Sequence, residues 1–149
     1  MTKLYFAYGS NLWPEQMQHR CPGHRIIGPG RLSGYRWIIS KRGYANIVKS
    51  LSDEVQGVVY EITESDERSL DRYEGVEIGS YGKAMMLVTI GKQVHGCLVY
   101  VDPIEEEGNP RHEYIDRINK GIAVSQLPAE YLDRYVRKFI PAETRPVNR

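Results

Sequence analysis

The spacing of apolar residues changes once along this chain of 149 residues, and that change limits the folds open to it. Up to Val101 the apolar residues form short strand-like runs broken by Gly and Pro, whereas from Tyr114 they recur at the three- and four-residue spacing of a helix. Strands and helices do not alternate strictly, so a parallel sheet of βαβ units is not expected. The pattern predicts an α+β fold with flanking helices, whose mostly antiparallel, mixed sheet is curled or barrel-like.

Local signals place the individual elements. Thr63 followed three residues later by Asp66 resembles a capping box, which marks the start of a helix. Gly91 and Lys92 stand between two alternating runs and predict a hairpin turn. The sequence therefore predicts strands over 3–8, 26–32, 35–40, 45–49, 55–62, 81–90 and 93–101, helices over 14–20 and 64–74, a helix with Tyr114, Ile115, Ile118 and Ile122 on one face, and a last helix opened by Pro128.

The length of the chain fits one domain. A chain of this size buries roughly 70% of its unfolded surface on folding, which is enough for a single core. We predict one domain over residues 1–140, followed by a flexible polar tail over 141–149.

Charge and cysteine content narrow the partners and the compartment. Twenty Lys and Arg against nineteen Asp and Glu give a net charge of +1, so no overall field draws the chain to nucleic acid or to an anionic membrane. Cys21 and Cys97 cannot form a disulfide framework, and no apolar run approaches the roughly 18 residues that span a bilayer. The first residues lack a signal-peptide pattern. We expect a cytoplasmic protein with a small-molecule partner.

A corner between the first strand and the first helix is the first candidate site. It reads Tyr8-Gly9-Ser10-Asn11-Leu12, in which Gly9 can take a positive φ and the two polar residues suit a turn or a helix N-terminus. Such a corner directs several backbone N–H groups into one space, where they can hold a carboxylate or a carbonyl oxygen. Ser10 lacks the flanking glycines of a nucleophile elbow, so we expect it to shape the loop. Taken alone, a corner of this kind is more often only a turn.

Two acids of the predicted helix 64–74 are candidates for a general base. Glu74 lies four residues after the apolar Leu70 and shares its face, and Glu67 lies on the same stripe, so helical spacing leaves both open. Glu74 stands at the helix C-terminus, where the helix dipole and partial burial both raise a carboxyl pKa. Arg72 beside it would lower that pKa if it folded back.

The remaining candidates carry weaker signals. His19, Cys21 and His24 cluster without a fourth ligand, so the sequence predicts no metal site. Tyr81 and Tyr114 each open an element after a glycine- or proline-marked loop, from which a phenol can reach a cleft or pack in the core.

Several motifs, in order along the chain, are similar to those of one enzyme family. From residue 5 to about residue 135 the chain resembles the γ-glutamylcyclotransferase family. The motifs are Tyr8-Gly9-Ser10-Asn11-Leu12, Gly43-Tyr44-Ala45-Asn46-Ile47-Val48, Gly57-Val58-Val59-Tyr60, Asp71-Arg72-Tyr73-Glu74-Gly75-Val76 followed by Tyr81, Tyr114 with Gly121, and Leu127-Pro128-Ala129-Glu130-Tyr131.

The resemblance implies an activity and a site. In members of the family the α-amino group of a γ-glutamyl compound attacks its own γ-carbonyl and releases 5-oxoproline, with no cofactor. The implied roles are general acid and base for Glu74 rather than Glu67, substrate-binding loop for Tyr8, Gly9, Ser10, Asn11 and Leu12, and cleft lining for Tyr81 and Tyr114.

Three points stay open in the sequence. Asn11 distinguishes the first motif from the Tyr-Gly-Ser-Leu of glutathione-specific members and from the Tyr-Gly-Thr-Leu of the γ-glutamylamine branch. This difference favours γ-glutamyl amino acids as substrates. Substrate choice, however, resides in loops. A non-catalytic module that binds small ligands or partners on the same fold is the alternative. A homodimer is neither predicted nor excluded.

Overall fold

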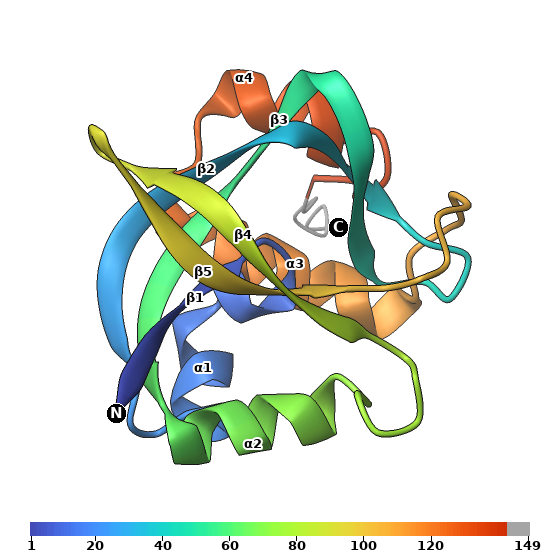
Figure 1. Ribbon diagram of the computed structural model, residues 1–149. Coiled ribbons are helices and arrows are strands. Elements are labelled where there is room, and N and C mark those ends of the chain that lie inside the picture. The colour runs from blue at the N-terminus through green and yellow to red at the C-terminus, as the bar shows by residue number, and fades with distance from the viewer. Residues whose placement is uncertain (143–149) are drawn as a thin grey trace, which may run out of the picture.

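The structure is a computed structural model that describes residues 1–142, and its centre is a closed five-stranded barrel. The strands are β1 (Thr2–Ala7), β2 (Arg25–Ile39), β3 (Ala45–Thr63), β4 (Gly82–Ile90) and β5 (Gln93–Val101), in the order β1-β3-β2-β4-β5 around the barrel (Figure 1). Neighbouring strands are antiparallel except β1 and β5, which close the barrel in parallel. The predicted α+β fold with a barrel-like mixed sheet is confirmed. Of the predicted tail, residues 143–149 lie outside the described residues.

Strands β2 and β3 are longer than the sequence predicted. The runs 26–32 and 35–40 form one strand, and the runs 45–49 and 55–62 form another, so the prediction of four short strands here was wrong. The pairing of β2 with β3 shifts register between Ile26 and Gly28 and again between Ser33 and Tyr35. Gly28 and Gly34 have positive φ at these irregularities. Gly34 bends the strand where the sequence suggested that it ends, and Gly28 bends it inside the predicted run 26–32.

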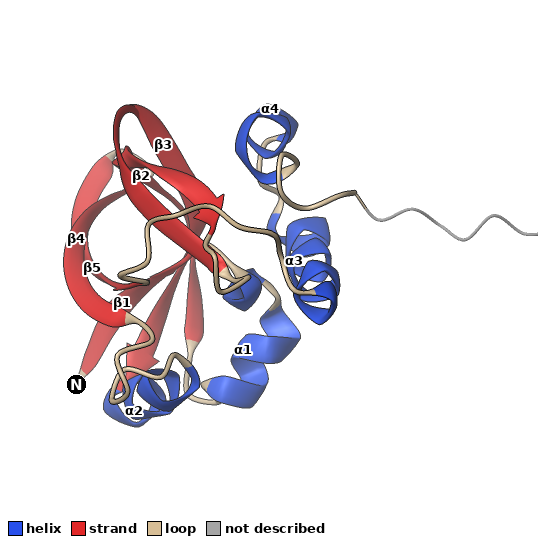
Figure 2. Ribbon diagram, turned by 90° about the vertical axis from the view of Figure 1, so that its right-hand side faces the viewer, coloured by secondary structure: helices blue, strands red, loops and turns tan. Residues whose placement is uncertain are grey.

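Helices cover one end and one side of the barrel. They are η1 (Ser10–Leu12), α1 (Pro14–Arg20), α2 (Glu64–Tyr73), α3 (His112–Ser125), α4 (Ala129–Tyr131) and the π-helical η2 (Leu132–Val136). Figure 2 shows α1 and α2 at the lower end of the barrel and α3 and α4 beside it. The predicted last helix is present only as the short α4 continued by η2, because the hydrogen-bond pattern widens to that of a π-helix after Tyr131.

Helix α2 forms where its sequence signals place it. The Thr63 side chain accepts a hydrogen bond from the Asp66 N–H, and the Asp66 carboxylate accepts one from the Thr63 N–H, so the predicted capping box is confirmed. Leu70 is fully buried against the barrel, which contributes roughly 1.5–3 kcal/mol to stability. The helix ends at Tyr73, and Glu74 is its C-cap. Glu74 therefore stands directly after the last turn of α2, among the residues that line the cavity.

The core fills the inside of the barrel and extends under the helices. Its largest fully buried side chains include Trp37, Tyr60, Phe6, Met17 and Ile38. No helix among residues 1–142 is long and apolar enough to cross a membrane. The corner after β1, the loop between β2 and β3 and the segment after α2 all meet at one side of this core, where a cavity remains.

Candidate active site

One cavity collects segments that lie far apart in the sequence. It has a volume of about 360 Å³, within the range of small-molecule sites. Its walls come from the segments 5–11, 42–45 and 72–81 and from Arg20, Tyr100, Tyr114 and Arg117. Of the residues singled out in the sequence, Tyr8, Gly9, Ser10, Asn11, Glu74, Tyr81 and Tyr114 all line it.

Glu74 places a carboxyl group in this cavity without a partner. Its N–H donates to the Leu70 carbonyl (2.8 Å), which fixes the backbone at the end of α2. Its carboxyl group lies in the crowded interior, and within residues 1–142 it makes no hydrogen bond or ion pair. Burial raises the pKa of Glu74 to about 7, although the charges of three arginines pull it down. A carboxyl group with this pKa can both take up and return a proton near neutral pH.

Glu67 lies outside the cavity. Its carboxylate forms ion pairs with the ammonium groups of Lys3 (2.9 Å) and Lys83 (2.5 Å) in a separate surface depression. Partial burial acts to raise the pKa of Glu67, but the hydrogen bonds and charges of the two lysines outweigh it and hold the pKa below its usual value. The two acids that helical spacing left open are therefore separated by the fold.

The corner after β1 takes a different backbone shape from the one expected. Gly9 has φ −120°, so it does not use the positive φ that a glycine can take. Glycine is required there by space: a Cβ would lie 2.9 Å from the Tyr114 hydroxyl and 3.0 Å from the Ala45 Cβ. Ser10 and Asn11 then open η1, whose first N–H groups have no acceptor within the helix. The residues that carry these N–H groups line the cavity at this corner.

The side chains of the corner hold its shape. The Gln16 Nε2 donates to the Ser10 Oγ (2.7 Å) and to the Asn11 Oδ1 (2.8 Å), and the Asn11 Nδ2 donates to the Tyr5 hydroxyl (2.9 Å). The Tyr60 hydroxyl donates to the Asn11 carbonyl (2.8 Å). Both polar side chains are engaged by the protein, as expected for residues that shape the loop. Sequence reasoning missed Gln16, whose role appears only when α1 packs behind the corner.

Leu12 does not line the cavity. It is buried in the core, and a Cβ on Gly121 of α3 would lie 2.8 Å from the Leu12 Cβ. Leu12 therefore packs η1 against α3, and it is not among the residues that line the cavity.

Tyr81 and Tyr114 converge on Ala45 from opposite sides. The Tyr81 hydroxyl donates to the Ala45 carbonyl (2.7 Å), and the Ala45 N–H donates to the Tyr114 hydroxyl (3.2 Å). Burial raises the pKa of Tyr114 to about 12 and that of Tyr81 further above its usual value. Both phenols therefore stay protonated and can donate or accept hydrogen bonds in the cavity.

Three arginines face Glu74, and none of them was predicted from the sequence. Arg20 is the last residue of α1, Arg42 lies between β2 and β3, and Arg117 lies in α3; each lowers the pKa of Glu74. Arg72, which the sequence suggested for this effect, is exposed and is not among the charges that shift Glu74. Contacts between segments this far apart leave no local pattern by which they could have been found.

The donor set of the cavity does not suggest a metal. Within residues 1–142, no three His, Cys, Asp or Glu side chains are grouped as metal ligands would be. Cys21 is buried and directs its thiol toward the Asp66 carbonyl (3.7 Å). One acid, two phenols, backbone donors and arginines suit proton transfer and the binding of an anionic or carbonyl-containing molecule.

The chain is similar to known proteins in both sequence and fold. A sequence model of the AIG2-like family matches residues 54–135. Human γ-glutamylcyclotransferase is 33% identical over 143 residues, which cover 88% of this chain and 76% of the human protein, and the mouse protein of that name is 34% identical over 89% of this chain and 77% of its own. A solved structure described as a γ-glutamyl cyclotransferase superposes with a TM-score of 0.84 at 29% identity and covers 99% of this chain and 93% of its own.

Proposed function

This chain belongs to the AIG2-like family that includes the γ-glutamylcyclotransferases, and from that premise we propose that it is a cyclotransferase acting on a γ-glutamyl amino acid or a related γ-glutamyl compound. The products are 5-oxoproline and the free amino acid or amine. The observation that carries the proposal is the unpaired carboxyl group of Glu74 in the same cavity as the backbone donors of residues 8–11.

Proton transfer at Glu74 gives the reaction its base and its acid. The α-amino nitrogen of the substrate attacks the γ-carbonyl carbon, a C–N bond forms, and the ionised Glu74 takes the proton that the nitrogen loses. The carboxyl group then returns this proton to the departing nitrogen as the original amide C–N bond breaks. Its pKa of about 7 suits both steps, because neither protonation state is strongly disfavoured near neutral pH.

Backbone donors stabilise the charge that develops on oxygen. As the amine attacks, negative charge grows on the γ-carbonyl oxygen, and N–H groups of Gly9, Ser10 and Asn11 can donate to it. The hydrogen bonds of Gln16 and Tyr60 hold this corner in place before the substrate arrives, so little reorganisation accompanies the reaction.

The reaction is intramolecular, which explains why so few groups suffice. A cavity that keeps the γ-glutamyl chain folded back removes much of the entropic barrier to ring closure. Tyr81 and Tyr114, fixed on the backbone of Ala45, supply rigid walls for this conformer. Substrate positioning, one acid and one set of backbone donors are then sufficient for ring closure.

Release of 5-oxoproline tests the proposal directly. Purified protein is incubated with a panel of γ-glutamyl dipeptides, glutathione and γ-glutamyl-lysine, and 5-oxoproline is quantified by liquid chromatography. We expect turnover of at least one dipeptide. Calorimetric binding of a γ-glutamyl compound without any 5-oxoproline would instead support a non-catalytic binding module on this fold.

A further inference from the structure

Charge is unevenly distributed over the walls of the cavity. The deep wall is made of buried phenols and the corner after β1, and its one ionisable acid is Glu74. Four arginines also line the cavity, namely Arg20, Arg42, Arg72 and Arg117, and all of them are more exposed than the buried phenols of the deep wall. The mouth is therefore positively charged while the interior is largely neutral, which favours a ligand whose outer part is anionic.

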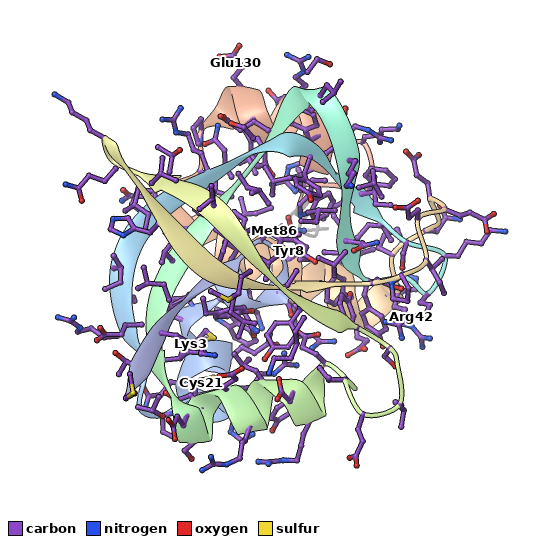
Figure 3. All side chains as sticks on the ribbon, viewed as in Figure 1. Lys3, Tyr8, Cys21, Arg42, Met86 and Glu130 are labelled. Carbon is purple, nitrogen blue, oxygen red and sulfur yellow. The ribbon has the colours of Figure 1, made fainter. Side chains whose placement is uncertain are left out.

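Arg42 is the most firmly held of these arginines. Its Nε donates to the Asp102 Oδ2 (3.0 Å), and that carboxylate is completely buried. The Ser40 Oγ and the Ile104 N–H also donate to Asp102 (3.1 and 2.8 Å), so the anion that anchors Arg42 is itself fixed. In Figure 3, Tyr8 is labelled near the middle of the view and Arg42 nearer its edge. The network fixes a guanidinium group between the interior and the mouth.

The guanidinium of Arg42 still has donors to offer. Its carbon lies 5.2 Å from the ring centre of Tyr81 and 5.7 Å from that of Tyr44, and its Nη2 donates weakly to the Ser80 carbonyl (3.4 Å). Within residues 1–142 its Nη1 has no hydrogen-bond partner. A carboxylate in the cavity could accept from this edge, which has the fork geometry that carboxylates match.

The other two arginines near Glu74 are held less firmly than Arg42. Arg20 donates to the Asn11 Oδ1 (3.3 Å) and lies over the Tyr73 ring. Arg117 donates to the Gln16 Oε1 (3.3 Å) and to Glu113 (3.2 Å). The buried Nε of Arg117 has no partner within residues 1–142, and neither Arg20 nor Arg117 is anchored on a buried carboxylate. Arg42 is therefore the arginine whose guanidinium is held most firmly where a ligand can meet it.

We propose that Arg42 determines specificity by binding the carboxylate of the amino acid that leaves the γ-glutamyl group. The inference rests on the proposed function, because it places the folded-back γ-glutamyl part inside, between Glu74 and the corner, and the leaving part at the mouth. A leaving group with a carboxylate gains charge-assisted hydrogen bonds from Arg42, whereas a simple amine gains none. A cationic leaving group meets the positive mouth and is disfavoured.

A matched pair of substrates isolates this contact. γ-Glutamyl-alanine and γ-glutamyl-ethylamine differ only in the carboxylate of the leaving group, and kcat/KM for each is measured as 5-oxoproline release. We expect the wild-type chain to prefer γ-glutamyl-alanine by about tenfold to a hundredfold. Arg42→Gln should bring this ratio close to one by lowering only the γ-glutamyl-alanine value, and Arg42→Lys should restore part of it.

The ratio also separates specificity from folding. Arg42→Gln leaves the buried Asp102 without its cation, which lowers stability, but a ratio of two substrates on one preparation does not depend on the folded fraction. Arg25→Gln, which removes an exposed arginine outside the cavity, is the control and should keep the wild-type ratio. An equal loss on both substrates, or a wild-type ratio near one, would overturn the inference and leave the proposed function standing. Absence of turnover with every γ-glutamyl compound would overturn both.

Discussion

Helix α2 carries two glutamates in opposite environments. Glu67 lies between two lysine ammonium groups and has a pKa below its usual value, whereas Glu74, at the C-cap, has no partner within residues 1–142 and a pKa raised to about 7 by burial. Both residues lie on one helical stripe, so the helix itself does not distinguish them. The difference teaches that the pKa of an acid on this helix depends on whether the barrel brings a cation into contact with it.

Replacing each acid by its neutral isostere gives the largest expected effect. Glu74→Gln should lower kcat by roughly 10² to 10⁴, because the amide cannot accept the proton of the attacking amine. Glu67→Gln should keep kcat near the wild-type value, because its carboxylate faces a different part of the surface. Initial rates of 5-oxoproline release at pH 7.5 check both variants. Full activity of Glu74→Gln would refute its assignment as the base.

The same substitution should reveal the cost of keeping Glu74 unpaired. A carboxyl whose pKa is raised on folding binds its proton more tightly in the folded state, so its ionisation destabilises the fold as pH rises from about 4.5 to about 7. Glu74→Gln avoids this ionisation and should be more stable than the wild type by roughly 3 kcal/mol at pH 8. The advantage should fade as pH falls toward 4.5. Urea unfolding across this range measures it, and a variant less stable than the wild type at pH 8 would contradict it.

Features that depend on contacts between residues close in the sequence could be predicted, and features that depend on distant contacts could not. The capping box of Thr63 and Asp66 and the hairpin at Gly91 are local, and the structure contains both. Gly34 looks the same in a sequence whether it ends a strand or bends it, so the length of β2 was missed.

The residues of the candidate site fall into the same two groups, those predicted from local motifs and those that were missed. The corner after β1 and Glu74 were found from short motifs, and the family resemblance selected Glu74 over Glu67. The physical basis of that choice could not be seen in the sequence. Lys3 of β1 and Lys83 of β4 come into contact with Glu67 only once the barrel has formed. Arg42 was missed for the same reason, because its ion-pair partner Asp102 directly follows β5 and is distant in the sequence.

The corner after β1 offers a test of the cavity alone. Gly9→Ala places a methyl group against the Tyr114 hydroxyl and the Ala45 Cβ. Tyr114 and Ala45 are hydrogen-bonded to each other, so they cannot both move away from this methyl group. The corner should shift and kcat/KM should fall about tenfold to a hundredfold, since small displacements of donors are costly. Gly96→Ala, whose nearest contact is the Met85 Cε at 3.8 Å, is the control with expected wild-type activity. A fully active Gly9→Ala would remove this corner from the reaction.

The smallest expected effect belongs to Glu67. Because the pKa of Glu67 is lowered in the folded chain, its ionised form stabilises the fold above the unfolded pKa of about 4.3, and that contribution is lost as pH falls below it. Ion pairs with partly exposed lysines are worth about 1 kcal/mol or less, so Glu67→Gln should cost up to that amount at pH 7 and almost nothing at pH 3. Urea unfolding at 0.05 M and 1 M salt checks the value, because screening should shrink it. The two isosteric substitutions on α2 should therefore change stability in opposite directions at pH 8, and equal signs would mean that Glu67 and Glu74 do not differ as their contacts indicate.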